Sequence, residues 1–74
     1  MSFVVEVASP PDRDDLVAEI WWNDQQVAEV RQSRDGSRYI ELYPSPSGIP
    51  WSFRVEEWLN AVWAAEARLQ KMGL

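Results

Sequence analysis

The chain of 74 residues contains no cysteine and no histidine. The first absence excludes a disulfide framework and a thiolate metal site. The second removes the commonest general base and the commonest metal ligand. The remaining candidate groups are Ser, Tyr, carboxylates and a single lysine, Lys71, without a glycine-rich phosphate loop or a nucleophile elbow. We therefore expect no catalytic residue, no metal site and no cofactor, and predict that the protein is not an enzyme.

Clustered positive charge and long apolar runs are also missing. The seven basic residues are scattered along the chain, and with twelve acidic residues the formal net charge is −5. Binding to a phosphate backbone needs a basic surface, so a nucleic-acid partner is not expected. The sequence has neither a run of about 20 apolar residues nor a signal-peptide pattern at its N-terminus. We expect no membrane association and a cytoplasmic location, in a small protein of bacterial style.

The apolar pattern predicts one small α+β domain over residues 1–74. Alternating or β-branched segments predict strands over 3–8, 16–22, 26–32 and 38–43. A stiff loop with three prolines follows over 44–50, and it leads to a helix expected from about residue 53 to a C-cap at Gly73. The fold class is an antiparallel β-meander of three strands plus an N-terminal strand, packed on one face by a single C-terminal helix (ββββα).

One side of the predicted helix carries apolar residues at three- and four-residue intervals, which predicts the face that packs on the sheet. These residues are Val55, Trp58, Leu59, Val62, Ala65, Leu69 and Met72. Trp58 and Trp22 are assigned to the core, because large aromatic side chains supply much of a small core's buried area.

The turns predict the register of the meander. A three-residue loop over 34–36, with Gly36 in the left-handed conformation, pairs Val30 with Ile40 and Ala28 with Leu42. A two-residue loop at Asp35-Gly36 would shift the pairing by one residue and mismatch the faces. A three-residue loop over 23–25 pairs Ile20 with Ala28 and Ala18 with Val30. The inner face then consists of Leu16, Ala18, Ile20, Trp22, Ala28, Val30, Ile40 and Leu42.

The same register predicts three rows of side chains on the outer face. They are Val17, Arg31 and Tyr39; Glu19, Glu29 and Glu41; and Trp21, Val27 and Tyr43. Carboxylates directly opposite one another are destabilising, so the glutamate row needs relief. One interpretation is an ordinary solvated face on which Arg31 and Arg38 lean across. Another is a docking site that receives cationic side chains of a partner, flanked by Trp21, Tyr39 and Tyr43. A third is a divalent-ion site or catalytic carboxylates.

Five tryptophans are many for a chain of this size. Trp21, Trp51 and Trp63 lie outside the predicted core, and exposed aromatic residues are typical of interfaces. The predicted interaction residues are Glu19, Glu29, Glu41, Trp21, Tyr39, Tyr43, Trp51 and Trp63. Hydrophobic burial and ordering entropy nearly cancel for 74 residues, so extra burial in a dimer or complex would help.

The element order resembles two known families. Three meander strands followed by a helix resemble part of the double-stranded-RNA-binding domain, but that family's N-terminal helix, basic patch and lysine cluster have no counterpart here. A strand, a meander and a helix also resemble the small antitoxins of the partial ribonuclease-H type, in topology only. The leading hypothesis is a protein-interaction domain that binds a partner or its own copy. The alternative is an immunity or antitoxin role against a basic partner, and a carboxylate-dependent enzyme is the third.

Overall fold

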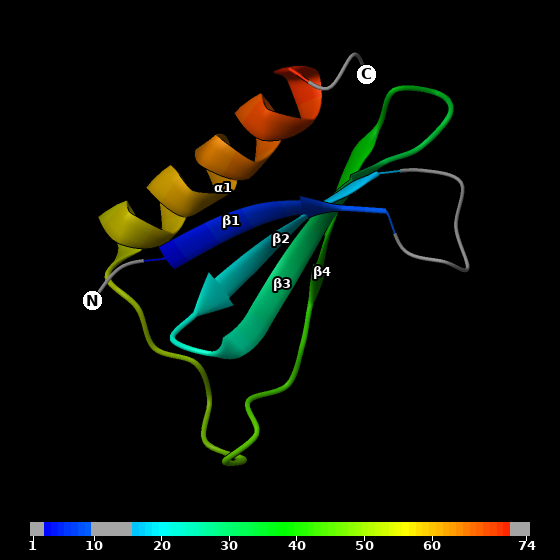
Figure 1. The fold of residues 1–74 in the computed structure, drawn as a ribbon. Helices are drawn as coiled ribbons and strands as arrows, with labels where there is room; N and C mark the ends of the chain where they lie inside the picture. Colours follow the sequence, from blue (N-terminus) through cyan, green and yellow to red (C-terminus); the bar gives the residue numbers. More distant parts are fainter. Residues whose placement is uncertain (1–2, 10–15, 72–74) are drawn as a thin grey trace.

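A computed structural model describes residues 3–9 and 16–71. Four strands form one antiparallel sheet in the order β1-β2-β3-β4, and one helix packs on a single face of it (Figure 1). The predicted α+β fold is therefore confirmed. The elements are β1 (Phe3–Ala8), β2 (Val17–Trp22), β3 (Gln25–Gln32), β4 (Arg38–Leu42) and α1 (Val55–Lys71). No helix within the described ranges is long and apolar enough to cross a membrane.

The loop between β3 and β4 has the predicted form. The Ser33 amide donates to the Ser37 carbonyl at 2.8 Å, the Gly36 amide donates to the Ser33 carbonyl at 3.0 Å, and Gly36 has a φ of 90°. Such a φ is freely available only to glycine, which explains the residue at this position. The resulting pairs are Val30 with Ile40 and Ala28 with Leu42, as predicted.

Asp35, at the tip of this loop, organises it through its side chain. Its carboxylate accepts hydrogen bonds from the Ser33 hydroxyl and, at 2.9 Å, from the Ser37 amide. These bonds favour the ionised form and hold the pKa of Asp35 below its ordinary value, with the Ser33 hydroxyl as the largest cause.

The β2–β3 hairpin differs from the prediction at its turn end. Its pairs Ile20–Ala28 and Ala18–Val30 are as predicted. The turn, however, is the two-residue segment 23–24, with Asn23 at a φ of 56°. Trp21 therefore pairs with Gln26, and a β-bulge leaves Val27 as an extra residue on β3. The predicted row containing Trp21 and Val27 is wrong, because Val27 is 1% exposed and belongs to the core.

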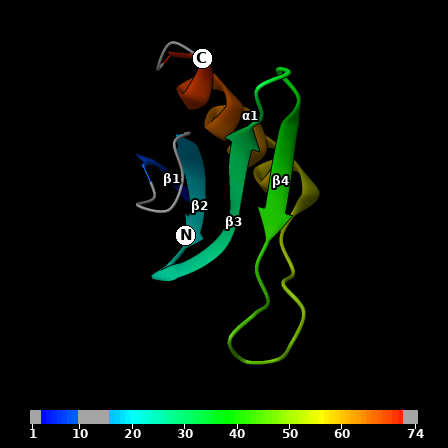
Figure 2. The ribbon, with the colours of Figure 1, turned by 90° about the vertical axis from the view of Figure 1, so that its right-hand side faces the viewer.

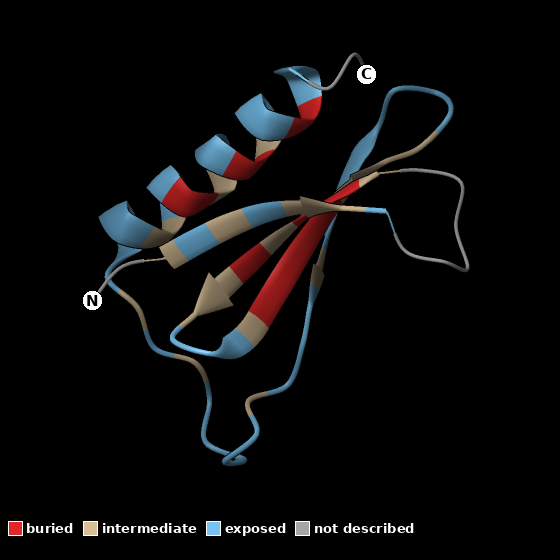
Figure 3. Ribbon diagram, in the orientation of Figure 1, coloured by how far each residue is buried: buried red, intermediate tan, exposed pale blue. Residues whose placement is uncertain are grey.

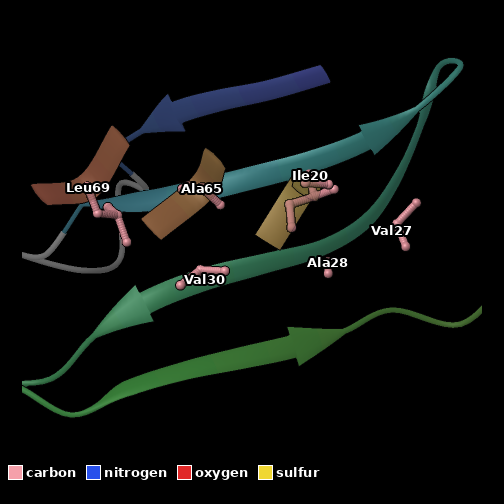
Figure 4. Close-up of a cluster of buried hydrophobic side chains, with 8 residues drawn as sticks. Ile20, Val27, Ala28, Val30, Ala65 and Leu69 are labelled. Carbon is pink, nitrogen blue, oxygen red and sulfur yellow. The ribbon is translucent and has the colours of Figure 1, made fainter. Parts of the chain in front are cut away.

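The core lies between the sheet and the side of α1 that faces it. It combines small and branched side chains of β2 and β3 with three residues of the helix, and Figure 4 shows part of this cluster. Its buried members are Ala18, Ile20, Val27, Ala28, Val30, Ala61, Ala65 and Leu69. Small alanine side chains on both the helix and the strands take up little space between them, so the helix backbone can approach the sheet closely.

The helix contacts β1 and β2 most, touches β3 only slightly, and does not pack on β4. Figure 1 shows it running beside β1, and Figure 2 shows it behind the sheet. The predicted packing face of the helix is therefore partly wrong. Val55 is 72% exposed and Leu59 is 42% exposed, whereas Ala61 is buried. Met72 and the predicted C-cap at Gly73 lie outside the described residues.

An aromatic cluster explains this placement. Phe3 of β1 packs against Phe53 with ring centroids 4.8 Å apart and against Trp58 of α1 at 5.7 Å. Trp22 of β2 completes the cluster at 4.8 Å from Phe3. These contacts hold the start of the helix over the β1 side of the sheet. Arg68 at the other end donates to the Val5 carbonyl at 3.1 Å, on the β1 edge.

Candidate functional site

The predicted glutamate row is present on the face of the sheet that the helix does not cover. Glu29 lies between Glu19 on β2 and Glu41 on β4 in the strand pairing. Strand β1 adds Glu6, which pairs with Glu19. The sequence did not predict this fourth member, because the position of the N-terminal strand within the sheet was left open.

Neighbouring side chains of the protein itself offset the repulsion among the carboxylates of this row. The Trp21 indole Nε1 donates to Glu19 Oε1 at 3.1 Å, and Arg31 Nε donates to Glu41 Oε1 at 3.0 Å. The Tyr43 hydroxyl donates to Glu29, which is only 5% exposed. The row is thus a hydrogen-bonded part of the fold.

Two arginines were expected to lean across the row, and only one does. Arg31 pairs with Glu41, and its guanidinium also lies 4.6 Å from the centroid of the Tyr39 ring. Arg38 instead reaches the helix side of the sheet, where its Nη1 lies 3.3 Å from Oε2 of Glu66. Its position on the strand has the same parity as Ile40 and Leu42, which places it on the inner face.

The described residues contain no group of three carboxylates close enough to hold a metal ion. What the outer face offers instead is a hollow of about 380 Å³ at the turn end of β1 and β2, lined by Val4, Glu6, Trp21, Asn23 and Asp24. Glu6 and Asp24 are exposed. Two carboxylates beside an indole ring suit a cationic side chain.

A second surface lies on the opposite face, beside the helix. Because α1 stays over β1 and β2, the inner face of β4 is uncovered. Ile40 is 42% exposed and Leu42 is 66% exposed, and Figure 3 shows β4 largely exposed beside the buried centre of β3. A hollow of about 290 Å³ opens here, which we call the α1–β4 groove. It is lined by Val27, Leu42, Trp51, Phe53, Val55 and Trp58.

The groove has an aromatic wall whose side chains hold one another in place. Trp51 stacks on Phe53 with centroids 5.6 Å apart, and its indole Nε1 donates to the Tyr43 carbonyl at 2.9 Å. Phe53 stacks in turn on Trp58 at 6.0 Å. Elsewhere along the helix, the Arg38–Glu66 ion pair joins β4 to α1.

The solvent side of α1 carries a further apolar feature. Val55, Leu59 and Trp63 follow one another at four-residue steps and are 72%, 42% and 59% exposed. Residues at such steps line one side of a helix. We call these three residues the apolar ridge, and it borders the α1–β4 groove through Val55.

The structure separates the predicted interaction residues into these surfaces. Trp21, Tyr39 and Tyr43 lie around the glutamate row, as predicted, whereas Trp51 lines the groove and Trp63 lies on the ridge. Sequence reasoning missed Ile40, Leu42, Val55 and Leu59 as exposed residues, because their apolar character assigned them to the core. The surplus of tryptophan was the signal that an apolar surface remained. No known protein family matches the chain, and neither do the curated proteins or the solved structures compared with it.

Proposed function

We propose that the chain is a non-enzymatic protein-interaction domain that binds its partner through the α1–β4 groove. The observation that carries the proposal is the uncovered inner face of β4. Ile40 and Leu42 are exposed on the side of the sheet that should be buried, and Leu42 lines the groove together with the exposed Val55 of the helix. A contiguous apolar surface of this kind is typical of a docking site.

The area of the chain supports the same proposal. A monomer of 8.6 kDa is expected to expose about 4,700 Å² of surface. The chain exposes 5286 Å². The chain therefore has surface to spare for an interface, and coverage of the groove by a partner would remove apolar surface from water at about 25 cal/mol per Å².

The groove also has the composition of an interface centre. Its tryptophans are held in place by stacking and by the hydrogen bond of Trp51, so a partner does not have to order them. Rigid aromatic side chains lose little entropy on binding and are frequent among the residues that dominate binding energy.

Photo-crosslinking inside the cells that produce the protein tests this proposal. The photoreactive residue p-benzoylphenylalanine replaces Leu42 or Val55 in the groove. It replaces Gln70, which is exposed on the same helix, as the matched control. We expect covalent adducts from positions 42 and 55 and none from position 70, with mass spectrometry identifying the attached chain. Equal labelling at all three positions, or no adduct at any, would contradict a docking site in the groove.

The hollow at Glu6, Trp21 and Asp24 supports a second candidate, an immunity-like protein that neutralises a basic partner. Its carboxylates and its indole would receive an Arg or Lys side chain, and the net charge of −5 would attract a basic surface.

Its test begins with the neighbouring open reading frame, which should encode a basic and toxic protein. Co-expression of this chain should then rescue growth, and Glu6→Gln with Asp24→Asn should weaken the rescue more than the control Glu56→Gln with Glu57→Gln on the helix. Rescue that is insensitive to the first pair of changes, or the absence of such a reading frame, removes this candidate.

A further inference from the structure

We infer that the occupant of the α1–β4 groove is a second copy of this chain, bound through a symmetric contact in which the apolar ridge of each copy enters the groove of the other. This inference rests on the proposed function, since it names the partner of the same groove. It makes the protein a homodimer whose two helices cross side by side in antiparallel directions.

One chain carries both halves of a complementary contact. The groove is an apolar hollow of about 290 Å³. The ridge is a protruding apolar feature, and its largest member, Trp63, is 59% exposed. Groove and ridge are adjacent, because both include Val55. A two-fold axis between two copies can therefore join ridge to groove twice, as an isologous interface requires.

Such an axis dictates which residues of the two helices lie opposite one another. Leu59 is the central member of the ridge, both along the helix and around it. An axis that passes beside Leu59 brings it against Leu59 of the second copy. Trp63 and Val55 lie four residues from Leu59 in opposite directions along the helix, so Trp63 of one copy lies opposite Val55 of the other. Because Val55 lines the groove with Leu42 and Trp51, this register places the Trp63 side chain over the groove.

Two copies of a chain with net charge −5 repel each other, so the contact must not bring their carboxylates together. The antiparallel register keeps the acidic residues of the helix apart. Glu56 falls opposite Val62, Glu57 opposite Ala61 and Glu66 opposite Ser52. No carboxylate faces another in the helix contact, so the repulsion that remains acts at longer range and is screened by salt.

Area and edge geometry favour this contact over pairing of the two β4 edges. The chain exposes 5286 Å², about 600 Å² more than a monomer of its mass should, and a standard interface covers about 800 Å² per partner. Edge pairing centred on Glu41 would put two glutamates opposite one another. In any register, edge pairing leaves the ridge and Trp63 uncovered, whereas ridge-in-groove packing covers both apolar features at once.

Single cysteines test the register, and the natural chain has none to interfere. Leu59→Cys should oxidise to a covalent dimer, because each sulfur lies opposite its symmetry mate. Val55→Cys alone and Trp63→Cys alone should form little, whereas a mixture of the two should form the mixed disulfide. Ala64→Cys, exposed elsewhere on the helix, is the control that should stay monomeric under brief oxidation.

Sedimentation equilibrium of the otherwise unmodified protein gives the second readout. We expect a monomer–dimer equilibrium that tightens as NaCl rises from about 0.05 to 0.5 M, because screening weakens the repulsion between like-charged copies. Trp63→Ala should weaken dimerisation about 30-fold or more, as expected for a buried aromatic anchor. Ala64→Ser, which changes an exposed residue of the helix outside the ridge, should leave it unchanged.

The outcomes separate the two proposals. A protein that stays monomeric up to about 100 µM overturns the homodimer, and so does a dimer that Leu59→Cys fails to trap. In either case adducts to a different protein at positions 42 and 55 would still support a docking site. If those positions give no adduct at all, the proposed function fails as well.

Discussion

The side of α1 that packs on the sheet is tested by the same substitution at two positions of one helix. Leu59 and Leu69 belong to the apolar stripe that the sequence predicts, yet Leu69 is 0% exposed and Leu59 is 42% exposed. Replacement by Ala changes helix propensity equally at the two sites, because both lie inside α1. Any difference in stability therefore reports burial alone.

The magnitudes follow from the packing. Leu69→Ala leaves a cavity between α1 and the sheet, and such changes cost about 2–5 kcal/mol. Leu59→Ala loses roughly half of a leucine's burial and leaves no enclosed cavity, so it should cost about 1 kcal/mol. A domain of this size is stable by about 4–11 kcal/mol in total. Leu69→Ala should thus lower the melting temperature by roughly 10 °C or more.

The assay is urea unfolding followed by circular dichroism, at a concentration where sedimentation shows the monomer. That condition keeps any contribution of Leu59 to a dimer out of the measurement. Equal losses of stability for the two variants would refute the observed rotation of the helix and would fit the predicted stripe, in which both leucines are buried. A larger loss for Leu59→Ala would mean that Leu59, and not Leu69, faces the sheet.

Three further outcomes are expected. Arg31→Met should lower stability by about 1 kcal/mol in urea unfolding, because Glu41 loses its cation and the stacking on Tyr39 ends; an unchanged midpoint would mean that the Arg31–Glu41 pair does not stabilise the fold. Asp35 has a lowered pKa in the folded state, so it contributes stability above its unfolded value near 3.8 that is lost as pH falls through the folded value. In Asp35→Asn the unfolding midpoint should change less with pH between pH 5 and about pH 2.5 than it does in the wild type. An identical dependence on pH in the two proteins would count against the hydrogen bonds of this carboxylate. Gly36→Ala should cost about 1 kcal/mol because its φ is 90°, with thermal melting as the measure and Gly36→Asn as the milder comparison; a neutral Gly36→Ala would contradict the left-handed loop.

The sequence by itself determined the local and pairwise features of this protein. Gly36 sets the loop between β3 and β4, and the alternation of apolar residues then selects one register, because a slip of one residue exchanges the faces. Glu29 opposite Glu41 follows from that register. Glu19 joins them although the turn at 23–24 is one residue shorter than predicted, because the β-bulge at Val27 restores the predicted pairing from Ile20 onward. These features depend on residues near one another in the chain, where turn geometry leaves few alternatives.

Only the tertiary structure decided where the helix lies and therefore which apolar residues are exposed. Apolar residues at three- and four-residue steps cover a wide part of α1, and the periodicity does not choose among rotations within that range. The choice comes from the pairing of β1 with β2 and from the packing of Phe3 against Phe53 and Trp58. These contacts draw the helix away from β4. They join residues some 50 positions apart in the chain, so local patterns did not reveal them. The groove, the exposed ridge and the acidic hollow at Glu6 all follow from that long-range packing.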